Sequence, residues 1–330
     1  MNTFVMASAD DHVLLHHLAF YGLADILDTA GAASVRLTWD ATRPTLTADA
    51  LDENIIEQAV RNHITARRRW VDEQFGPDRR GLMSPRLSAI NSDGAWRDLQ
   101  SRREAVLDRL TNDHEWADLR FLAALGEPCY WSHPRGEPRP DHGASRLEMQ
   151  PRNRGSEFVG NRLRPLATAL LARAPGQISS GLAGRTTADE IGGKPDSVSA
   201  TGLTTPGPVD NALVWCALWA IGQFPLTVRI DRPAVNSGHL GGRRNEWLYG
   251  PVWEGPWRPG RLRSILASAP LRTAATAGQP NVDALALRSA QSWLRVRGVL
   301  GIARFPIQRF GSDNAPERRA LRADMLPTAL

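Results

Sequence analysis

Apolar residues recur at helical spacing in several parts of the chain. Over 12–30 the apolar positions fall on one broad face, which is typical of an amphipathic helix. Asp10 and Asp11 precede this segment as candidate N-caps, and Gly31 follows it as the expected end. A second helix is predicted over 51–71, where the apolar residues share one side of the helical wheel.

The same patterns predict the remaining elements. Further helices are expected over 95–125 with a break near Asn112, 156–174, 211–224, 258–269 and 282–295. Alternating or short apolar segments predict strands at 34–39, 44–47, 129–131, 226–230 and 299–305. Clusters of Gly, Pro, Ser and Asp without periodicity predict loops at 76–95, 132–154 and 231–260. We therefore predict an α+β fold that is predominantly helical, with small β-sheets.

The composition changes over 175–210. This segment is rich in Gly, Ser, Thr and Pro and contains no aromatic residue. Such a composition predicts a flexible loop or linker, which can also become ordered on binding. The chain is therefore expected to form two lobes. These are an N-terminal lobe over 1–174, helical with a short sheet, and a basic C-terminal lobe over 211–330.

Charge is distributed unevenly along the 330 residues. The net charge is +5, and the forty basic residues include a single Lys, Lys194. The shortage of Lys is most simply a property of the genome. Residues 1–60, however, carry a net charge of −7, whereas 174–330 carry +7. A basic surface opposite an acidic one favours a nucleic-acid partner.

Two features bear on where the protein works. The first residues lack the basic segment of a signal peptide, and the longest apolar run, 212–221, is too short for a bilayer span of about 20 residues. The two Cys cannot form a disulfide framework. We expect a cytoplasmic protein that does not contact a membrane.

The common catalytic motifs are missing. Lys194 is followed by Pro195 instead of the hydroxyl residue of a P-loop, and neither G-x-G-x-x-G nor G-x-S-x-G occurs. His12 and His16 have the spacing of a zinc pair, but a third ligand at a recognisable spacing is absent. We therefore expect no catalytic residue, no metal and no cofactor.

One enzymatic alternative stays open. The loop segment 133–148 contains His133, Asp141 and His142, residue types that bind divalent ions. This loop would supply the site if the protein were a metal-dependent nuclease.

Three groups of polar residues fit nucleic-acid binding better. One group surrounds a predicted helix start, where backbone N–H groups and Arg side chains suit phosphate oxygens. The second lies in a Gly-rich loop that can approach a groove closely, and the third is at the C-terminus. The candidate nucleic-acid-binding residues are Arg152, Arg154, Arg162, Arg164, Asn236, Arg243, Arg244, Asn245, Arg309, Arg318 and Arg319.

Tryptophan is unusually frequent, with eleven residues in the chain. Most lie in apolar periodic segments and are expected in the core. Trp253 and Trp257 are less clearly core residues, and Trp side chains can stack on unpaired bases.

Four segments together resemble a known family. They are HHLAFYGLADIL at 16–27, LWAIGQFP at 218–225, PVWEGPW at 251–257, and the tail 304–320 with RFP at its start and NAPERRA at its end. In these segments the chain resembles CRISPR-associated proteins of the divergent type I large-subunit group, in the Csb and Csx families.

The resemblance implies a non-enzymatic subunit of an RNA-guided surveillance complex that acts in antiviral defence. Such a subunit binds guide RNA, recognises target double-stranded DNA and the short motif beside it, and contacts the other effector subunits. It also helps to recruit a helicase-nuclease. In these complexes base pairing reads the target, while the protein reads shape, phosphates and a few base edges. An assembly scaffold without direct nucleic-acid contact is the further alternative.

Overall fold

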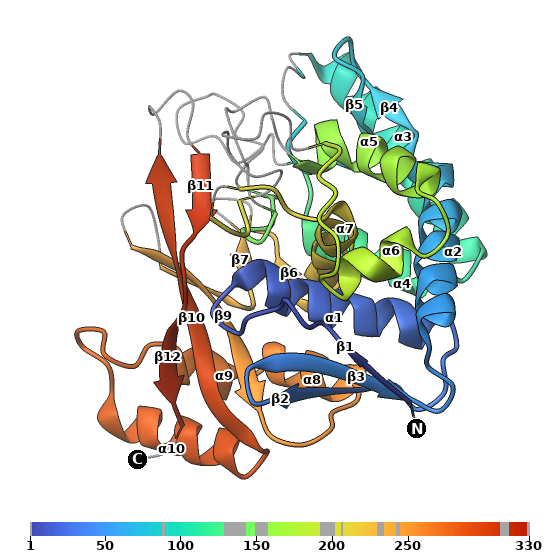
Figure 1. The fold of residues 1–330 in the computed structure, drawn as a ribbon. Coiled ribbons are helices and arrows are strands. Elements are labelled where there is room, and N and C mark those ends of the chain that lie inside the picture. The colour runs from blue at the N-terminus through green and yellow to red at the C-terminus, as the bar shows by residue number, and fades with distance from the viewer. Residues whose placement is uncertain are drawn as a thin grey trace.

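The computed structural model describes residues 2–87, 90, 92–128, 143–148, 158–191, 202–205, 207–229, 234–241, 245–310 and 317–328. Within them the chain forms an α+β fold in which helices predominate and the sheets are small and separate (Figure 1). The predicted fold class is confirmed. The expected strand at 129–131 and most of the expected loop at 132–154 lie outside the described residues.

The first sheet is built from residues near the N-terminus. Its strands are β1 (Asn2–Val5), β2 (Arg36–Asp40) and β3 (Arg43–Ala48), in the antiparallel order β1-β3-β2. Leu37 of β2 lies opposite Leu46 of β3, and both are fully buried. The alternation read at 34–39 and 44–47 thus places one face of the hairpin against the core, and the predicted pairing is confirmed.

Helix α1 (Leu14–Thr29) runs through the middle of the molecule (Figure 1). Most of its side chains are buried, including some on the face that the sequence pattern left outside the apolar stripe. The predicted N-caps are wrong, because Val13 is the N-cap residue and makes no side-chain capping bond. The predicted end is correct, since Gly31 follows the helix with a left-handed φ of 82°.

Helix α7 (Asn211–Trp219) crosses α1 at very close range. A Cβ atom added to Gly22 of α1 would lie 1.8 Å from the carbonyl oxygen of Cys216 in α7. Only a glycine permits this approach. Helix α7 is apolar all round and continues into the 3₁₀ helix η2 (Ala220–Gln223). The helix predicted over 211–224 is therefore confirmed as two consecutive segments.

A group of helices packs beside α1 and α7. It comprises α2 (Glu53–Val71), α3 (Asp93–Asn112), α4 (Trp116–Leu125), α5 (Phe158–Ala172) and α6 (Gln177–Leu182). The break predicted near Asn112 separates α3 from α4. A small hairpin of β4 (Gln74–Phe75) and β5 (Arg80–Gly81) lies between α2 and α3 in the sequence.

The C-terminal half holds the largest sheet. Its strands are β8 (His239–Gly241), β9 (Glu246–Trp253), β10 (Val299–Phe310), β11 (Glu317–Ala320) and β12 (Asp324–Pro327), and β9 and β10 form its centre. The short strands β6 (Leu226–Thr227) and β7 (Val235–Asn236) pair separately. Helices α8 (Pro259–Leu266), α9 (Ala269–Ala274) and α10 (Ala284–Arg295) lie between β9 and β10 in the sequence.

The prediction of a loop over 231–260 is wrong. Gly250 and Pro251 suggested a turn, yet both belong to β9 and pair with β10. A proline is tolerated at this position because β8 pairs only with Glu246, Trp247 and Leu248 at the start of β9. Pro251 lies beyond the end of β8, so no ladder hydrogen bond to β8 requires a backbone N–H there. The Pro251 carbonyl oxygen instead accepts a hydrogen bond from the Tyr21 hydroxyl at 3.2 Å.

One hydrophobic core joins the two predicted lobes. It contains buried residues of 1–174 together with Trp215, Trp219, Trp253 and Trp257. Trp253 and Trp257 are fully buried core residues, so they do not present a face to a base. The backbones of Leu37 and Trp257 also exchange two hydrogen bonds of 2.8 Å each. The two predicted parts of the chain therefore share buried contacts, and their division into two lobes stays a prediction.

The segment predicted as a flexible linker contains ordered structure. Helix α6 lies within this segment. Asp210, the last residue of the 175–210 segment, accepts a hydrogen bond from Arg173, which directly follows α5. Asp210 also accepts from the backbone N–H groups of Ala188 and Ala212. Residues 177–182 and 207–210 therefore have defined structure and contacts, whereas 192–201 lie outside the described residues, and the flexibility of the segment stays a prediction.

The buried His17 makes the stability of the fold sensitive to acid. Its Nε2 donates to the carbonyl oxygen of Asp11 at 2.7 Å, and its Nδ1 lies 3.0 Å from the Tyr21 hydroxyl. Burial lowers the pKa of His17 to about 3, although the hydrogen bond to Asp11 acts in the opposite direction. In the unfolded chain the pKa is about 6.5. As the pH falls below that value, protons bind the unfolded state first and stability declines.

We expect His17 alone to lower the free energy of unfolding by about 1.4 kcal/mol between neutral pH and about pH 5.5. Urea denaturation at the two pH values measures this change. His63 is also buried with a lowered pKa, so it adds to the decline. A His17→Gln variant should show a shallower decline than the parent, and an unchanged pH dependence would contradict the assignment.

Candidate functional site

Helices α8 and α10 present a surface of arginine side chains. Arg288 and Arg295 are exposed seven residues apart on α10, so they lie on one face of it. Arg258 and Arg261 are exposed at the start of α8, and Arg297 follows α10. The Arg261 Nη2 donates to the carbonyl oxygen of Arg297 at 2.6 Å, which brings the two helix ends together. We call these five residues the basic face.

Two of the five guanidinium groups lie on tryptophan rings. The Arg297 guanidinium carbon is 3.6 Å from the centre of the Trp293 ring, and that of Arg261 is 4.7 Å from the Trp257 ring. Stacking of this kind is favourable and restricts the side chain while leaving donor edges available. The basic face is therefore partly organised before any ligand binds.

Arginines outnumber carboxylates in the segment that carries the basic face. Residues 254–310 contain nine Arg and two acidic residues. Asp283 caps the N-terminus of α10 with its side chain, and the exposed Glu254 donates its backbone N–H to the Gly298 carbonyl oxygen at 2.8 Å, beside Arg297. Of the other Arg in this range, Arg263 pairs with Asp25, and the carboxylate of Asp324 lies 4.0 Å from Arg304. In the part of the chain that the structure describes, none of the five basic-face residues forms an ion pair. The charge count over 254–310 could be read from the sequence, but Arg309 alone of the predicted binding residues lies in this range.

Three large apolar side chains are exposed on or beside α10. Leu285 on α10 is 66% exposed, Val296 directly after α10 is 81% exposed, and Leu300 near the start of β10 is 53% exposed. Apolar and aromatic groups between arginines suit a ligand with both phosphates and exposed rings, and they also suit a protein partner.

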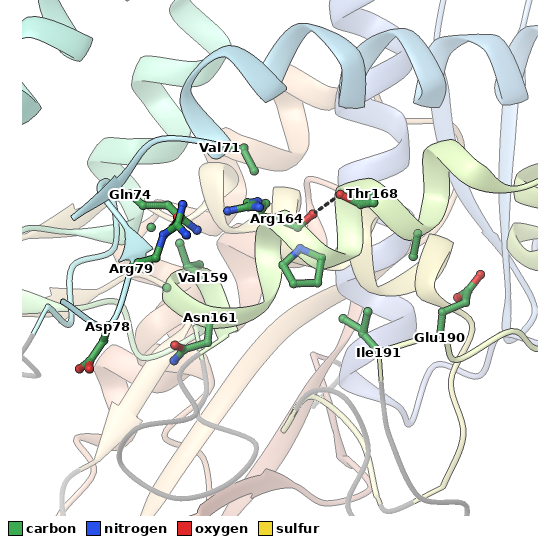
Figure 2. Close-up of a pocket in the computed structure, with 14 residues that line it drawn as sticks. Val71, Gln74, Asp78, Arg79, Val159, Asn161, Arg164, Thr168, Glu190 and Ile191 are labelled. Atoms are coloured by element: carbon green, nitrogen blue, oxygen red, sulfur yellow. Dashed lines mark hydrogen bonds between the residues drawn. The ribbon is translucent and has the colours of Figure 1, made fainter. Parts of the chain in front are cut away.

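A pocket lies elsewhere, between α5, the end of α2 and the β4–β5 hairpin (Figure 2). Its volume is about 520 Å³, within the range of small-molecule sites. Figure 2 shows Arg164 extending from α5 towards the hairpin that carries Arg79. Apolar groups form much of the remaining wall: Val71, Val159, Pro165, Ala169 and Ile191.

One of the two carboxylates in the pocket lining has a close cationic partner. Glu190 lies 2.8 Å from Arg173 and accepts a hydrogen bond from Asn211. Burial alone would raise the pKa of Glu190, but the hydrogen bonds from Arg173 outweigh it and lower the pKa. Asp78 is largely exposed, and the Arg80 guanidinium lies 4.0 Å from it.

The two arginines of the pocket are less fully neutralised. Arg79 bonds only to the Gln74 amide oxygen, at 3.0 Å, and has no ion pair among the described residues. The nearest carboxylate oxygen to Arg164 belongs to Asp72, at 4.0 Å. Asp72 itself is held by Arg68 at 2.6 Å. The pocket lining therefore contains two arginines without a close carboxylate partner, together with two carboxylates, of which Glu190 is held by Arg173.

The structure separates the sequence-predicted site residues. Arg164 lines the pocket, and Arg162 is half-buried on the same helix. Arg309 and Asn245 are exposed at the far ends of β10 and the β8–β9 hairpin, and Arg319 is half-buried in β11. Four of the predicted residues lie outside the described part of the chain: Arg152, Arg154, Arg243 and Arg244.

Two of the predicted binding residues have structural roles instead. Asn236 is fully buried, where its side chain accepts from the Arg146 backbone N–H at 2.8 Å and donates to Ser145 at 3.1 Å. Arg318 is buried and pairs with Glu246 of β9. Both side chains hold segments of the fold together, so their assignment to nucleic-acid contact is corrected. Their polarity indicated a surface, but the tertiary structure supplies internal partners.

No cluster of three or more metal-binding side chains occurs in the described residues. His16, of the considered zinc pair, accepts from the Asp10 backbone N–H at 2.9 Å, and the other member, His12, contacts the Ala323 carbonyl oxygen. The predicted nuclease loop with His133, Asp141 and His142 lies outside the described residues, so that alternative stays a hypothesis.

Comparison with known proteins adds no relative. No protein-family model matches this chain, and a search of curated proteins found no match either. The resemblance to CRISPR-associated proteins thus rests on the four sequence segments alone. Among the described helices, none has both the length and the apolar character needed to cross a membrane.

Proposed function

We propose that this protein is a non-enzymatic nucleic-acid-binding subunit, and that the basic face is its contact surface. The observation that carries the proposal is a group of five Arg that have no ion pair in the described structure and belong to a segment, 254–310, with nine Arg and two carboxylates. Arg261 and Arg297 also donate to backbone carbonyl oxygens, but no carboxylate has to be released from any of the five before it binds a phosphate, and the planar fork of Arg fits phosphate oxygens.

The resemblance in four sequence segments supports a more specific proposal. In that proposal the chain is a cytoplasmic subunit of a type I RNA-guided complex that contacts guide RNA or target double-stranded DNA. A binding role of this kind requires arginines and polar backbone groups but no catalytic residue. Copurification of RNA of uniform length with the chain, in a host that expresses a repeat array, would support it.

The double substitution Arg288→Ala/Arg295→Ala tests the contact surface. Both side chains are exposed and have no partner in the described structure, so the fold should be unaffected. We expect affinity for a duplex of about 20 base pairs to fall at least tenfold at low salt. The slope of log affinity against log salt should decrease by about 1.8, since each lost phosphate contact contributes about 0.9. Fluorescence anisotropy across a salt series measures both quantities.

Arg43→Ala is the matched control, because Arg43 is also exposed but lies in the first sheet. It should retain most of the affinity. If both variants lose affinity equally, or if neither does, the basic face is not the contact surface. Binding to anionic vesicles that exceeds binding to the duplex would favour a membrane instead.

The exposed side chains of Leu285, Val296 and Leu300 favour a second candidate, an assembly scaffold that docks a protein partner. This candidate predicts that the purified chain does not bind duplex DNA or RNA even at low salt. Crosslinking of guide or target to α10 in an assembled complex would exclude it.

A further inference from the structure

The pocket between α5 and the β4–β5 hairpin has the properties of a ligand site in its own right. It lies at one end of the molecule, whereas α10 lies at the other (Figure 1). The contacts of the basic face therefore do not account for it. We propose that this pocket binds a phosphorylated small molecule of nucleotide size, with Arg79 and Arg164 on the phosphate.

The two arginines of the pocket are the groups best placed to bind an anion. Glu190 is held by Arg173 at 2.8 Å and Asp72 by Arg68 at 2.6 Å, whereas Asp78 is 66% exposed and lies 4.0 Å from Arg80. These partners do not line the pocket, whereas the incompletely neutralised Arg79 and Arg164 do. A phosphate placed between the two guanidinium groups would supply the missing negative charge, and Arg side chains bind phosphate through paired donors.

The position of Arg79 is unusual for a residue with a side chain. Its φ is 51°, in the left-handed region at the turn of the β4–β5 hairpin. Glycine is the residue that adopts this conformation without cost. The hydrogen bond from the Arg79 Nε to the Gln74 side chain at 3.0 Å holds the guanidinium group beside the pocket.

The size and the apolar wall of the pocket exclude a bare phosphate as its best ligand. A volume of about 520 Å³ is much larger than one phosphate group needs. Val71, Val159 and Pro165 would gain little from an inorganic ion, but they can pack against a sugar or a base. Thr168 and Gln74 add polar side chains to the lining. A nucleoside phosphate combines these chemical features in one ligand.

Such a ligand has two sources, a free nucleotide and the phosphorylated end of a strand. Isothermal titration of the full chain with a nucleoside monophosphate, the parent nucleoside and inorganic phosphate tests the site itself. We expect saturable binding of the monophosphate, at least tenfold weaker binding of phosphate, and no binding of the nucleoside. Single-stranded oligonucleotides with a 5′-phosphate or a 5′-hydroxyl then distinguish the two sources.

Variants connect the binding to the two arginines. Arg79→Ala and Arg164→Ala should each weaken binding of the monophosphate at least tenfold, whereas Arg97→Ala, an exposed arginine on α3 outside the pocket, should leave it unchanged. Circular dichroism confirms that each variant is folded. If the monophosphate fails to saturate, or if the nucleoside binds equally well, the proposal is wrong.

The outcome is independent of the proposed function. The Arg288→Ala/Arg295→Ala variant should bind the monophosphate normally, because its substitutions lie on α10. A preference for the 5′-phosphorylated strand that disappears in Arg79→Ala would assign the pocket to a strand end. Equal affinity for both strands, combined with monophosphate binding, would assign it to a free nucleotide.

Discussion

Replacing Gly22 by alanine is expected to lower the free energy of unfolding by about 3 kcal/mol. The new Cβ would lie 1.8 Å from the carbonyl oxygen of Cys216 and 3.0 Å from the backbone nitrogen of Ala220. Because both obstacles are backbone atoms, no side-chain rotation relieves the clash. Helices α1 and α7 would have to move apart, and the buried aromatic residues around them would lose contacts.

Urea denaturation followed by circular dichroism measures this loss. Gly260→Ala is the matched control, because Gly260 lies in α8 and a Cβ added there meets no atom within 4 Å. That control should be neutral or slightly stabilising, since alanine favours the helix. Equal stability of the two variants would show that α1 and α7 do not cross as closely as described.

Replacing Asp210 by alanine should have an effect of comparable size, about 3 kcal/mol. Asp210 is buried, and it accepts from the Arg173 guanidinium at 2.8 Å, from Ala188 at 2.9 Å and from Ala212 at 2.8 Å. The substitution removes the N-cap of α7 and leaves Arg173 with Glu190 as its remaining carboxylate partner. A buried cation that loses a partner destabilises the fold far more than an exposed one.

The exposed pair of Glu53 and Arg185 provides the control for this second substitution. Both side chains are about half exposed, so Glu53→Gln should change the stability by less than about 1 kcal/mol. Chemical denaturation of both variants measures the difference, and limited proteolysis reports on the segment around 177–191. If Asp210→Ala unfolds at the same urea concentration as the parent, Asp210 does not tie this segment to α5 and α7.

Local patterns were sufficient for much of the fold. Helices α2, α3 and α4 and the pairing of β2 with β3 were predicted, because their apolar periodicity directly reflects which face is buried. The sequence patterns predicted the wrong structure where long-range contacts stabilise a conformation that the local residues disfavour. Gly250 and Pro251 favour a turn locally, yet β10 supplies a partner that keeps them in a strand.

The candidate site was predicted less well than the fold. Arg164 was identified and lines the pocket, but Arg79 was not, because its position depends on a hairpin of two short strands. Asn236 and Arg318 were assigned to the surface because polar residues in loops and tails are usually exposed. Their partners, Ser145 and Glu246, lie 91 and 72 residues away in the chain.

The sequence alone determined where the helices run and that the C-terminal half carries excess positive charge. Both properties follow from residue order and composition. The tertiary structure alone decided which arginines keep that charge available: Arg173 and Arg263 meet carboxylates, whereas Arg288 and Arg295 do not. The physical reason is that ion pairs form between side chains close in space. Asp25 and Arg263 are 238 residues apart in the chain, and only the packing of α8 against α1 brings them together.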